Sequence, residues 1–363
     1  MSRRAAVVGA GIAGLAAAHA LTKVGYEVRV LEQDSELRTD GAGLTLWPNA
    51  VRALKDIGLG DVVAESTVVV NEAVTLTPAG AVVTRVPLDR ISKSFGPLVS
   101  THRADLLSAL QARVGAKISF GVAVSATDGE LHALGERLED ELIVGADGVG
   151  SAVREAVAPG VGPRAAGYAA WRGVAETGKA TPDRASETMG RGKRFGLVPL
   201  KGGRTYWFAV VADGDGSDDL QAEFADWHRP IADVLAATPA VERSYLSLCD
   251  LPPLPHWHRD GIVLIGDAAH ATTPNLGQGA AQALEDVATL APLLRKQSPA
   301  DAFMHFEKTR KRRAERIVRQ SRTIGRIAQA SNPIAARMRD LAARSTPEAV
   351  AYRQFARILS PAS

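Results

Sequence analysis

The sequence predicts an α/β protein with a Rossmann-like dinucleotide-binding domain, a second, mostly antiparallel β-sheet domain, and a C-terminal helical region. Three apolar strands each end in a glycine-containing turn followed by a helix. Segments between them alternate apolar and polar residues, which is typical of half-buried antiparallel strands. We therefore expect a discontinuous Rossmann-like domain at 1–68, 99–160 and 255–335, a sheet domain at 69–98 and 161–254, and a helical tail at 336–363.

The composition sets limits on partners and compartment. The chain has 363 residues, of which 46% are hydrophobic and 23% charged, and a net charge of +3. So small a charge gives no reason to expect a nucleic-acid partner. Cys249 is the single cysteine, which excludes an intramolecular disulfide and favours a cytoplasmic location. We expect no membrane span and no metal site.

The first glycine turn lies in "AAVVGAGIAGLAAAHALTKVGYEVRVLEQ", which reads as strand, turn, helix and strand. Gly9 permits the tight turn, Gly11 lets the backbone approach a pyrophosphate, and Gly14 allows close packing of helix on strand. Glu32 ends the second strand, where an acid accepts a hydrogen bond from a ribose 2′-hydroxyl. An acid there repels the 2′-phosphate of NADP, so the sequence predicts FAD or NAD.

The second and third turns are "ELIVGADGVGSAVREAV" and "GIVLIGDAAHATTPNLGQG". The second alone is equally well explained as an ordinary turn formed by Asp147 and Gly148, with Ser151 as a helix N-cap. In the third, Asp267 ends a strand and can accept from a sugar-alcohol hydroxyl. Gly277 and Gly279 expose backbone N–H groups at a helix start, which favours the anionic edge of a reduced flavin.

These three stretches, in this order, resemble the class A flavoprotein monooxygenases, the single-component aromatic hydroxylases related to para-hydroxybenzoate hydroxylase. "GAGIAG", "GADGVGSAVR" and "GDAAHATTPNLGQG" correspond to the family's three fingerprints. Further similar stretches are "GAGLTLWPNAVRAL", "THRADLLSAL" and "YAAWRGV". The resemblance extends from residue 5 to about residue 325, and it implies that the Rossmann-like domain binds FAD tightly.

The resemblance also implies which residues contact the cofactor. Arg103 matches an arginine that contacts FAD, or is a surface cation at a helix start. Val124, at the end of the short strand "KISFGVAV", falls where the family packs the adenine, or belongs to the core. The implied cofactor-binding residues are Gly9, Gly11, Gly14, Glu32, Gln33, Gly43, Leu44, Arg103, Val124, Asp147, Arg154, Asp267, Gly277, Gln278, Gly279 and Ala280. His270 has no acid partner visible in the sequence and is read as a packed structural histidine.

The predicted sheet domain supplies candidates for a substrate pocket. In the family such a sheet covers the flavin, and aromatic side chains suit a planar ring. Arg204 and Tyr206 lie two residues apart, hence on one strand face, and are the candidate catalytic residues; ordinary sheet packing explains them equally well. The strands also carry Tyr168, Trp171, Arg172 and Phe208. Trp47 either lines the pocket or packs in the core.

The resemblance implies that NADH or NADPH reduces FAD and that a flavin C4a-hydroperoxide then hydroxylates or epoxidises a small aromatic or heteroaromatic substrate with O2. No second dinucleotide fingerprint is present, so the reductant is expected to bind transiently. We expect a monomer or homodimer. The alternative is a flavin-binding protein without turnover, acting as a sensor or as a scaffold that protects an unstable intermediate. A halogenase would require a Trp-x-Trp-x-x-Ile-Pro segment, which the sequence lacks.

Overall fold

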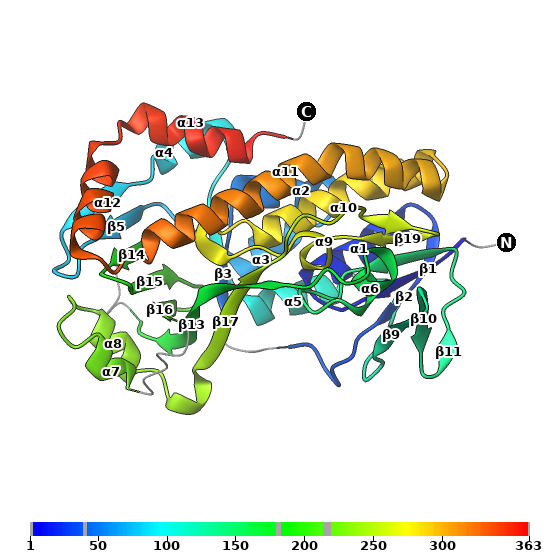
Figure 1. Ribbon diagram of the computed structural model, residues 1–363, viewed down its shortest axis with the longest axis horizontal. Helices are drawn as coiled ribbons and strands as arrows, with labels where there is room; N and C mark the ends of the chain where they lie inside the picture. The colour runs from blue at the N-terminus through cyan, green and yellow to red at the C-terminus, as the bar shows by residue number, and fades with distance from the viewer. Residues whose placement is uncertain (1–2, 39–41, 179–182, 213–218, 362–363) are drawn as a thin grey trace.

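A six-stranded sheet forms one end of the molecule (Figure 1). The computed structural model describes residues 3–38, 42–178, 183–212 and 219–361. The strand order is β18-β19-β12-β1-β2-β8, and all neighbours are parallel except β18 and β19. The strands are β1 (Arg3–Val8), β2 (Tyr26–Leu31), β8 (Lys117–Ser119), β12 (Leu142–Gly145), β18 (His258–Arg259) and β19 (Ile262–Leu264). The segments of all three predicted glycine turns therefore meet in this sheet.

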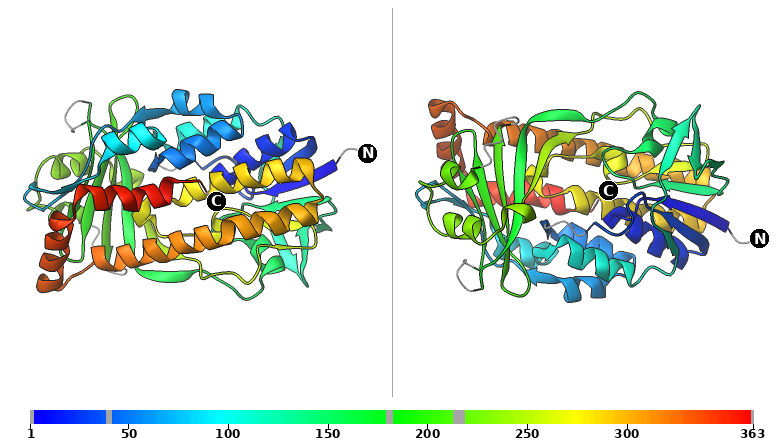
Figure 2. Two further views of the ribbon diagram at one scale, coloured as in Figure 1. Left: turned by 90° about the horizontal axis from the view of Figure 1, so that it is seen from above. Right: turned by 90° about the horizontal axis from the view of Figure 1, so that it is seen from below.

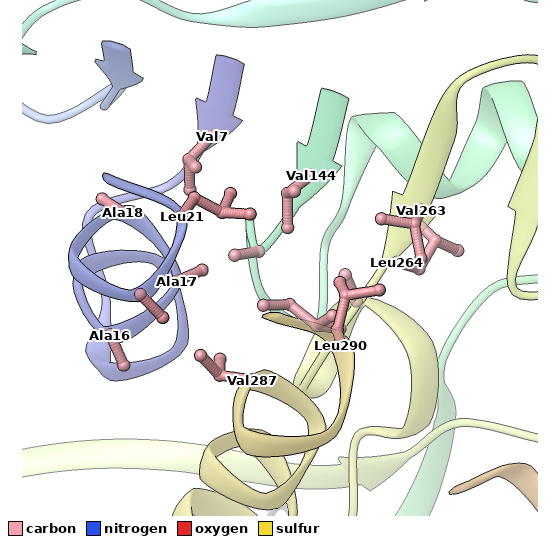
Figure 3. Close-up of a cluster of buried hydrophobic side chains, with 14 of the residues drawn as sticks. Val7, Ala16, Ala17, Ala18, Leu21, Val144, Val263, Leu264, Val287 and Leu290 are labelled. Carbon is pink, nitrogen blue, oxygen red and sulfur yellow. The ribbon is translucent and has the colours of Figure 1, made fainter. Parts of the chain in front are cut away.

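One face of this sheet is covered by helices. Figure 3 shows Val7, Val144 and Val263 of the strands facing Leu21 of α1 and Leu290 of α10 in a buried cluster. Parallel strands covered in this way read as nearly continuous apolar runs, as these do. Helix α1 (Ile12–Lys23) contacts the strands, and α10 (Gly279–Lys296) and α5 (Arg103–Gln111) pack against α1. Helix α2 (Pro48–Asp56) packs against α10, and α3 (Gly60–Ser66) packs against α2 and α5.

A small antiparallel sheet follows β8 in the chain, and the short helix that packs against it follows β12. Helix α6 (Ala152–Val157) packs against β9 (Val124–Thr127), which pairs with β10 (Glu130–Ala133), and β10 with β11 (Glu136–Arg137). The expected single strand over "KISFGVAV" is wrong. Gly121 has φ +72°, a backbone conformation that ends β8 and reverses the chain, so Val124 begins a new strand.

A seven-stranded sheet lies at the other end of the molecule, and we refer to it as the roof sheet. Its order is β17-β13-β16-β15-β14-β5-β6, antiparallel apart from the β5–β14 pair. The strands are β5 (Ala73–Leu76), β6 (Val82–Arg85), β13 (Arg164–Glu176), β14 (Ala185–Met189), β15 (Arg194–Pro199), β16 (Arg204–Ala212) and β17 (Ser244–Asp250). The expected fold class, a Rossmann-like domain beside a mostly antiparallel sheet, is confirmed.

The outer face of the roof sheet is covered by α7 (Leu220–Glu223) and α8 (Ile231–Ala236), and the exposed 3-10 turn η1 (Ala240–Glu242) follows them. Trp207, Phe195 and Phe224 form the centre of this contact. A third sheet of β3 (Gly43–Leu46), β7 (Val99–His102) and β4 (Thr67–Val69) lies beside α2 and α5, and its strand β3 contacts the roof. Helix α4 (Leu88–Phe95) joins β6 to β7.

Helix α11 (Pro299–Ala328) runs along α10 from the Rossmann-like end toward the roof sheet (Figure 1). The two final helices, α12 (Pro333–Ser345) and α13 (Glu348–Leu359), turn back over the molecule, and α13 packs against α4 (Figure 2). The loop before α10 holds a short helix, α9 (Asp267–His270), and a 3-10 turn, η2 (Pro274–Leu276). This loop lies between the two ends of the molecule and contacts α11.

Candidate active site

The three glycines of the first turn meet different surroundings. Gly9 has φ +101°, and a Cβ on it would lie 2.5 Å from the carbonyl oxygen of Ala146. A Cβ on Gly14 would lie 1.8 Å from the carbonyl oxygen of Gly9, so α1 packs directly on the turn. A Cβ on Gly11 would meet nothing within 4 Å. The N-terminus of α1, with its unpaired N–H groups, therefore faces open space that fits a pyrophosphate.

That open space is a cavity of about 390 Å³, within the range of ligand pockets. Gly9 and Gly11 line it from the first turn, and Glu32 and Gln33 from the end of β2. Arg103, Val124 and Asp147 line it from three other segments. The fold thus places seven predicted cofactor residues around one cavity.

Glu32 has a second role besides facing the cavity. Its carboxylate accepts hydrogen bonds from the backbone N–H groups of Ala10, at 2.6 Å, and Asp34, at 3.0 Å. It therefore joins the first turn to the end of β2. Gly9 adds a backbone bond to Leu31 at 2.7 Å.

The second turn is organised by Asp147. Its carboxylate accepts from the Ser151 hydroxyl at 2.6 Å and from the Val153 N–H at 3.1 Å. Burial raises the pKa of this carboxyl, although both hydrogen bonds oppose the shift. Ser151 accepts from the Arg154 N–H at 2.9 Å, which is the N-cap geometry expected for α6.

Arg154 connects the second turn to the third. The side chain is buried, and it donates to the backbone carbonyls of Val161 at 3.0 Å, Val149 at 2.7 Å and Ala268 at 3.3 Å. Burial lowers the pKa of its guanidinium. The structure therefore places Arg154 behind the turns, where it holds their backbones together.

Asp267 begins α9 instead of ending a strand. Gly266, with φ +58°, turns the chain between β19 and this helix. The Asp267 side chain is accessible, yet burial among surrounding protein atoms raises the pKa of its carboxyl, against the positive charges of His270 and Arg103. Arg103 links Asp267 to the cavity, because it lines that cavity and acts electrostatically on Asp267.

The third turn faces β3. Gly277 has φ +59°, and a Cβ on it would lie 3.1 Å from Thr45 Oγ1 and 3.0 Å from Trp47 Nε1. Gly279 begins α10, and Ala280 follows half-buried. The Gln278 side chain points into a buried network and accepts from Asn49 Nδ2 at 2.9 Å, and the residue as a whole is buried between the half-buried Gly277 and Gly279.

The roof sheet contacts strand β3, next to the third turn. A Cβ on Gly43 would lie 2.4 Å from Cβ of Tyr206, so the two backbones are in close contact, with Leu44 half-buried beside them. Burial raises the pKa of Tyr206 to about 12. Arg204, on the same strand face, donates to Asp105 Oδ2 on α5 at 2.5 Å and to the Lys201 carbonyl at 3.0 Å.

The inner face of the roof sheet carries alternate residues of each strand. Tyr168, Arg172, Tyr206 and Phe208 lie on this face. The expectation that Trp171 lines the same pocket is wrong. Because neighbouring residues of a strand point to opposite faces, Trp171 lies on the outer face, where it packs beside Trp207 and contacts the Tyr245 ring at 5.0 Å.

Three comparisons with known proteins agree with this geometry. A sequence model of the FAD binding domain family matches residues 3–321. The chain is 34% identical over 351 residues to the aurachin C monooxygenase/isomerase of Stigmatella aurantiaca, and the match covers 92% of each chain. It is 36% identical over 343 residues to the 3-amino-4-hydroxybenzoate 2-monooxygenase of Streptomyces cremeus, covering 88% of this chain and 86% of the relative. This chain belongs to the class A FAD-dependent aromatic monooxygenases.

Solved structures place the monooxygenase in the same group. Klebsiella pneumoniae HpxO, complexed with FAD and uric acid, matches it with a TM-score of 0.89 at 27% identity, over 98% of this chain and 96% of that one. The predicted family and the prediction that the chain is an FAD-dependent enzyme are confirmed. The relatives' shared monooxygenase activity favours catalysis over a flavin-binding protein without turnover.

His270 of the monooxygenase has an acid partner after all. Its Nε2 lies 2.6 Å from Asp286 Oδ2 on α10, and that oxygen also accepts from the Gly266 N–H at 2.9 Å. Arg310 of α11 donates to Asp286 Oδ1 at 2.8 Å and pairs with Glu285. Sequence reasoning missed this partner because the contact depends on how α9 and α10 pack. The third turn is therefore held by buried charges on two long helices.

Sequence reasoning also missed several residues at the site. Leu37, Arg38 and Val122 line the cavity. Asn275, inside the quoted third turn, donates to Tyr168 Oη at 2.8 Å and accepts from Arg194, so it joins this turn to the roof sheet. In the sequence, only the position of Asn275 beside Pro274 pointed to Asn275, and nothing pointed to Arg194. The described residues include no cluster of metal-ligating side chains, and no described helix is long and apolar enough to cross a bilayer.

Proposed function

We propose that this monooxygenase uses NADH or NADPH and O2 to hydroxylate, or epoxidise, a small aromatic or heteroaromatic compound. Names of relatives that act on an aminohydroxybenzoate, on urate and on 6-hydroxynicotinate support this class of substrate. The single cysteine supports a reducing, cytoplasmic setting. The chain offers no second dinucleotide fingerprint, so the reductant would bind transiently.

The observation that carries the proposal is the convergence of two sets of residues. The first and second turns line one cavity, and Arg103, which also lines it, acts electrostatically on Asp267 of the third turn. Beyond them, Gly43 and Gly277 lie where β3 contacts both the third turn and Tyr206 of the roof sheet. An FAD molecule bound there would have its nucleotide end in the cavity, and its flavin ring would lie beside the aromatic side chains of the roof sheet.

Each turn has a proposed role toward FAD. The first turn, with Gly9, Gly11 and Gly14, would hold the pyrophosphate, and Glu32 and Gln33 the adenosine ribose. Asp267 would accept from the ribityl chain, while Arg103, Val124 and Asp147 close the cavity. Backbone groups of Gly277, Gln278, Gly279 and Ala280 would face the flavin edge beside Gly43 and Leu44, with Arg154 fixing the turns. Bound FAD supplies the redox chemistry, accepting hydride and activating O2 for transfer to the ring.

The two candidate catalytic residues would act differently. Tyr206 stays protonated at neutral pH, because burial raises its pKa to about 12, so it would donate a hydrogen bond to the substrate and would not remove a proton. Arg204 is already paired with Asp105. We therefore give Arg204 a positioning role, holding Tyr206 and β16 against α5.

The test is to purify the protein and follow NADH and NADPH oxidation with and without aromatic compounds. The panel includes phenols, hydroxybenzoates, quinolones and purines. We expect a yellow protein that contains FAD, oxidation that a subset of the panel stimulates, and a product that gains an oxygen atom from isotope-labelled O2. A protein that binds FAD but shows no stimulated oxidation and no labelled product would instead be a flavin-binding protein without turnover.

A further inference from the structure

Arg172 differs from the other arginines enclosed at this site. Its Nε is buried without a hydrogen-bond partner, as is the Nε of Arg194, but Arg172 also has no described residue that forms a hydrogen bond or ion pair with the rest of its guanidinium. Arg194 pairs with Glu187 at 3.0 Å, Arg310 pairs with Asp286 at 2.8 Å, and Arg154 donates to three carbonyls. Arg172 is half-buried, so water reaches only part of it.

The position of Arg172 on the roof sheet places it over the site. It lies on β13 between two contacts that the inner face of the roof sheet makes, one with the third turn and one with β3. Four residues earlier on the same face, Tyr168 receives a hydrogen bond from Asn275 of the third turn. Two residues later, Val174 pairs with Tyr206, which contacts Gly43. Arg172 therefore faces the space between the roof sheet and the third turn.

Arg172 also stands beside an aromatic wall. In the strand register it is opposite Phe208, and the rings of Phe208 and Tyr206 are 6.0 Å apart. The positive charge of Arg172 opposes the burial that raises the pKa of Tyr206, so the two side chains are within electrostatic reach. A planar ring against these aromatic side chains would have its substituents next to the guanidinium.

The acids nearest in the register do not neutralise Arg172. Glu187, on the same face, forms an ion pair with Arg194. Glu176 lies at the exposed end of β13, opposite Arg204 in the strand register. Enclosing a cation without a partner costs free energy, and an anion in the site would offset that cost. A guanidinium donates two parallel hydrogen bonds to a carboxylate, which makes an arginine selective for such a group.

We propose that Arg172 binds an anionic oxygen substituent, above all a carboxylate, on the aromatic ring of the substrate. The inference rests on the proposed function and narrows it: the enzyme takes aromatic acids in preference to their neutral analogues. Arg172 would set specificity, while Tyr206 donates a hydrogen bond to another part of the same ring.

The first test compares acid and amide forms of the same ring on the holoenzyme. The probes are benzoate with benzamide, para-hydroxybenzoate with para-hydroxybenzamide, and a quinoline carboxylate with its carboxamide. Binding is measured by calorimetry and by perturbation of the flavin spectrum. We expect at least one acid to bind about ten- to a hundredfold more tightly than its amide, because hydrogen bonds to charged groups are the stronger kind. If every amide binds as tightly as its acid, the proposal is wrong.

The second test uses Arg172→Gln and Arg172→Lys, with Arg85→Gln as a matched control at the exposed edge of the same sheet. In R172Q the preference for the acid should disappear while amide binding and FAD content stay unchanged, and KM for the acid should rise more than kcat falls. R172K should recover part of the preference, and R85Q should resemble the wild type. Loss of FAD in R172Q and R172K alike, with R85Q normal, would assign Arg172 to the cofactor and overturn the proposal.

The two proposals fail in distinguishable ways. If no aromatic compound stimulates NADH or NADPH oxidation, the proposed function is wrong, regardless of which acids or amides bind to the protein. If stimulated oxidation is found but acids and amides are used equally well by the wild type and R172Q, the proposed function stands and only the assignment of Arg172 fails.

Discussion

At the scale of single residues, the first turn shows that three glycines can be required for three different reasons. Gly9 is required by its positive φ, Gly14 by the carbonyl that a Cβ would meet, and Gly11 by nothing within the protein. Gly11 also has φ −74°, which any residue adopts. Its glycine is explained only by a ligand that approaches the backbone.

This contrast leads to a first prediction, on Gly11→Ala and Gly14→Ala. G11A should leave the melting temperature of the FAD-free protein unchanged and weaken FAD binding by about tenfold or more, since overpacking costs about 1–3 kcal/mol. G14A gains about 1 kcal/mol of helix propensity. That gain is outweighed by the contact at 1.8 Å, so the FAD-free protein itself should become less stable. Thermal unfolding and fluorescence titration with FAD separate the two effects.

A second prediction concerns Tyr206, whose pKa is raised to about 12 by burial. Y206F should lower kcat/KM by about tenfold, the value of one hydrogen bond of about 1.4 kcal/mol. The alkaline limb of the pH–rate profile below pH ~10 should be the same in both proteins, because Tyr206 is protonated throughout that range. Disappearance of that limb in Y206F would mean that Tyr206 ionises there.

At the scale of elements, α9, α10 and α11 are joined by buried charges. Asp286 is fully buried and contacts His270 and Arg310, while Glu285 pairs with both Arg310 and Arg313. Asn49 of α2 also donates to Glu285 at 2.7 Å. The helices behind the third turn are thereby fixed relative to one another, which keeps that turn in place.

A third prediction follows for Asp286→Asn. Removing one partner of a buried pair leaves Arg310 poorly neutralised, which costs about 3–5 kcal/mol. D286N should therefore lower the free energy of unfolding by about that amount, measured by denaturant titration. The control is Arg319→Gln, which breaks a pair between the exposed Arg319 and Glu315 within α11 and should cost less than about 1 kcal/mol. Equal losses in the two variants would contradict the assigned role of Asp286.

The pH dependence gives a fourth prediction for the same group. Burial alone would raise the pKa of Asp286, but His270 and Arg310 outweigh it and lower the pKa. A lowered pKa contributes stability above the unfolded value near ~4, and this contribution is lost as the pH falls through the folded value. The difference in unfolding free energy between wild type and D286N should therefore be constant near neutrality and shrink below pH ~4. A difference that grows on acidification would contradict this sign.

At the scale of the whole molecule, the C-terminal helix closes over the loop before α2. Phe355 of α13 stacks on Trp47 at 5.0 Å, so Trp47 packs here in a small core. The last carbonyls of α13 are held by two arginines: Arg313 donates to Ile358 at 2.5 Å and Arg52 donates to Leu359 at 3.0 Å. The chain end is thus connected to the helices behind the site.

A fifth prediction tests this contact with Phe355→Ala. Phe355 is half-buried, so its loss should cost about 1–3 kcal/mol, below the range for a fully buried phenylalanine. The melting temperature should fall and the tryptophan emission should shift to the red as Trp47 gains water. Arg353→Ala, on the exposed face of the same helix, is the control and should leave both unchanged. An unshifted emission in F355A would show that Trp47 is covered by other residues.

The sequence by itself determined the parts of this protein that depend on local backbone geometry. Positive φ at Gly9 and Gly277, and the alternation along β13 and β16, follow from neighbours in the chain. The order of strand, turn and helix therefore predicted the cofactor domain and the roof sheet. Three local predictions were wrong: alternation does not reveal the turn at Gly121 inside "KISFGVAV", Trp171 lies on the outer face of the roof sheet, and Asp267 begins α9 instead of ending a strand.

The tertiary structure alone decided which charges meet. The pairings of His270 with Asp286 and of Arg204 with Asp105, like the lack of any partner for Arg172 among the described residues, depend on how helices and sheets pack. A side chain's direction is set locally, but its electrostatic partner is set by elements far away in the sequence. For that reason the proposed cofactor site could be inferred from its glycines, while the residue proposed to select the substrate could be recognised only after the partners of the other arginines at the site were known.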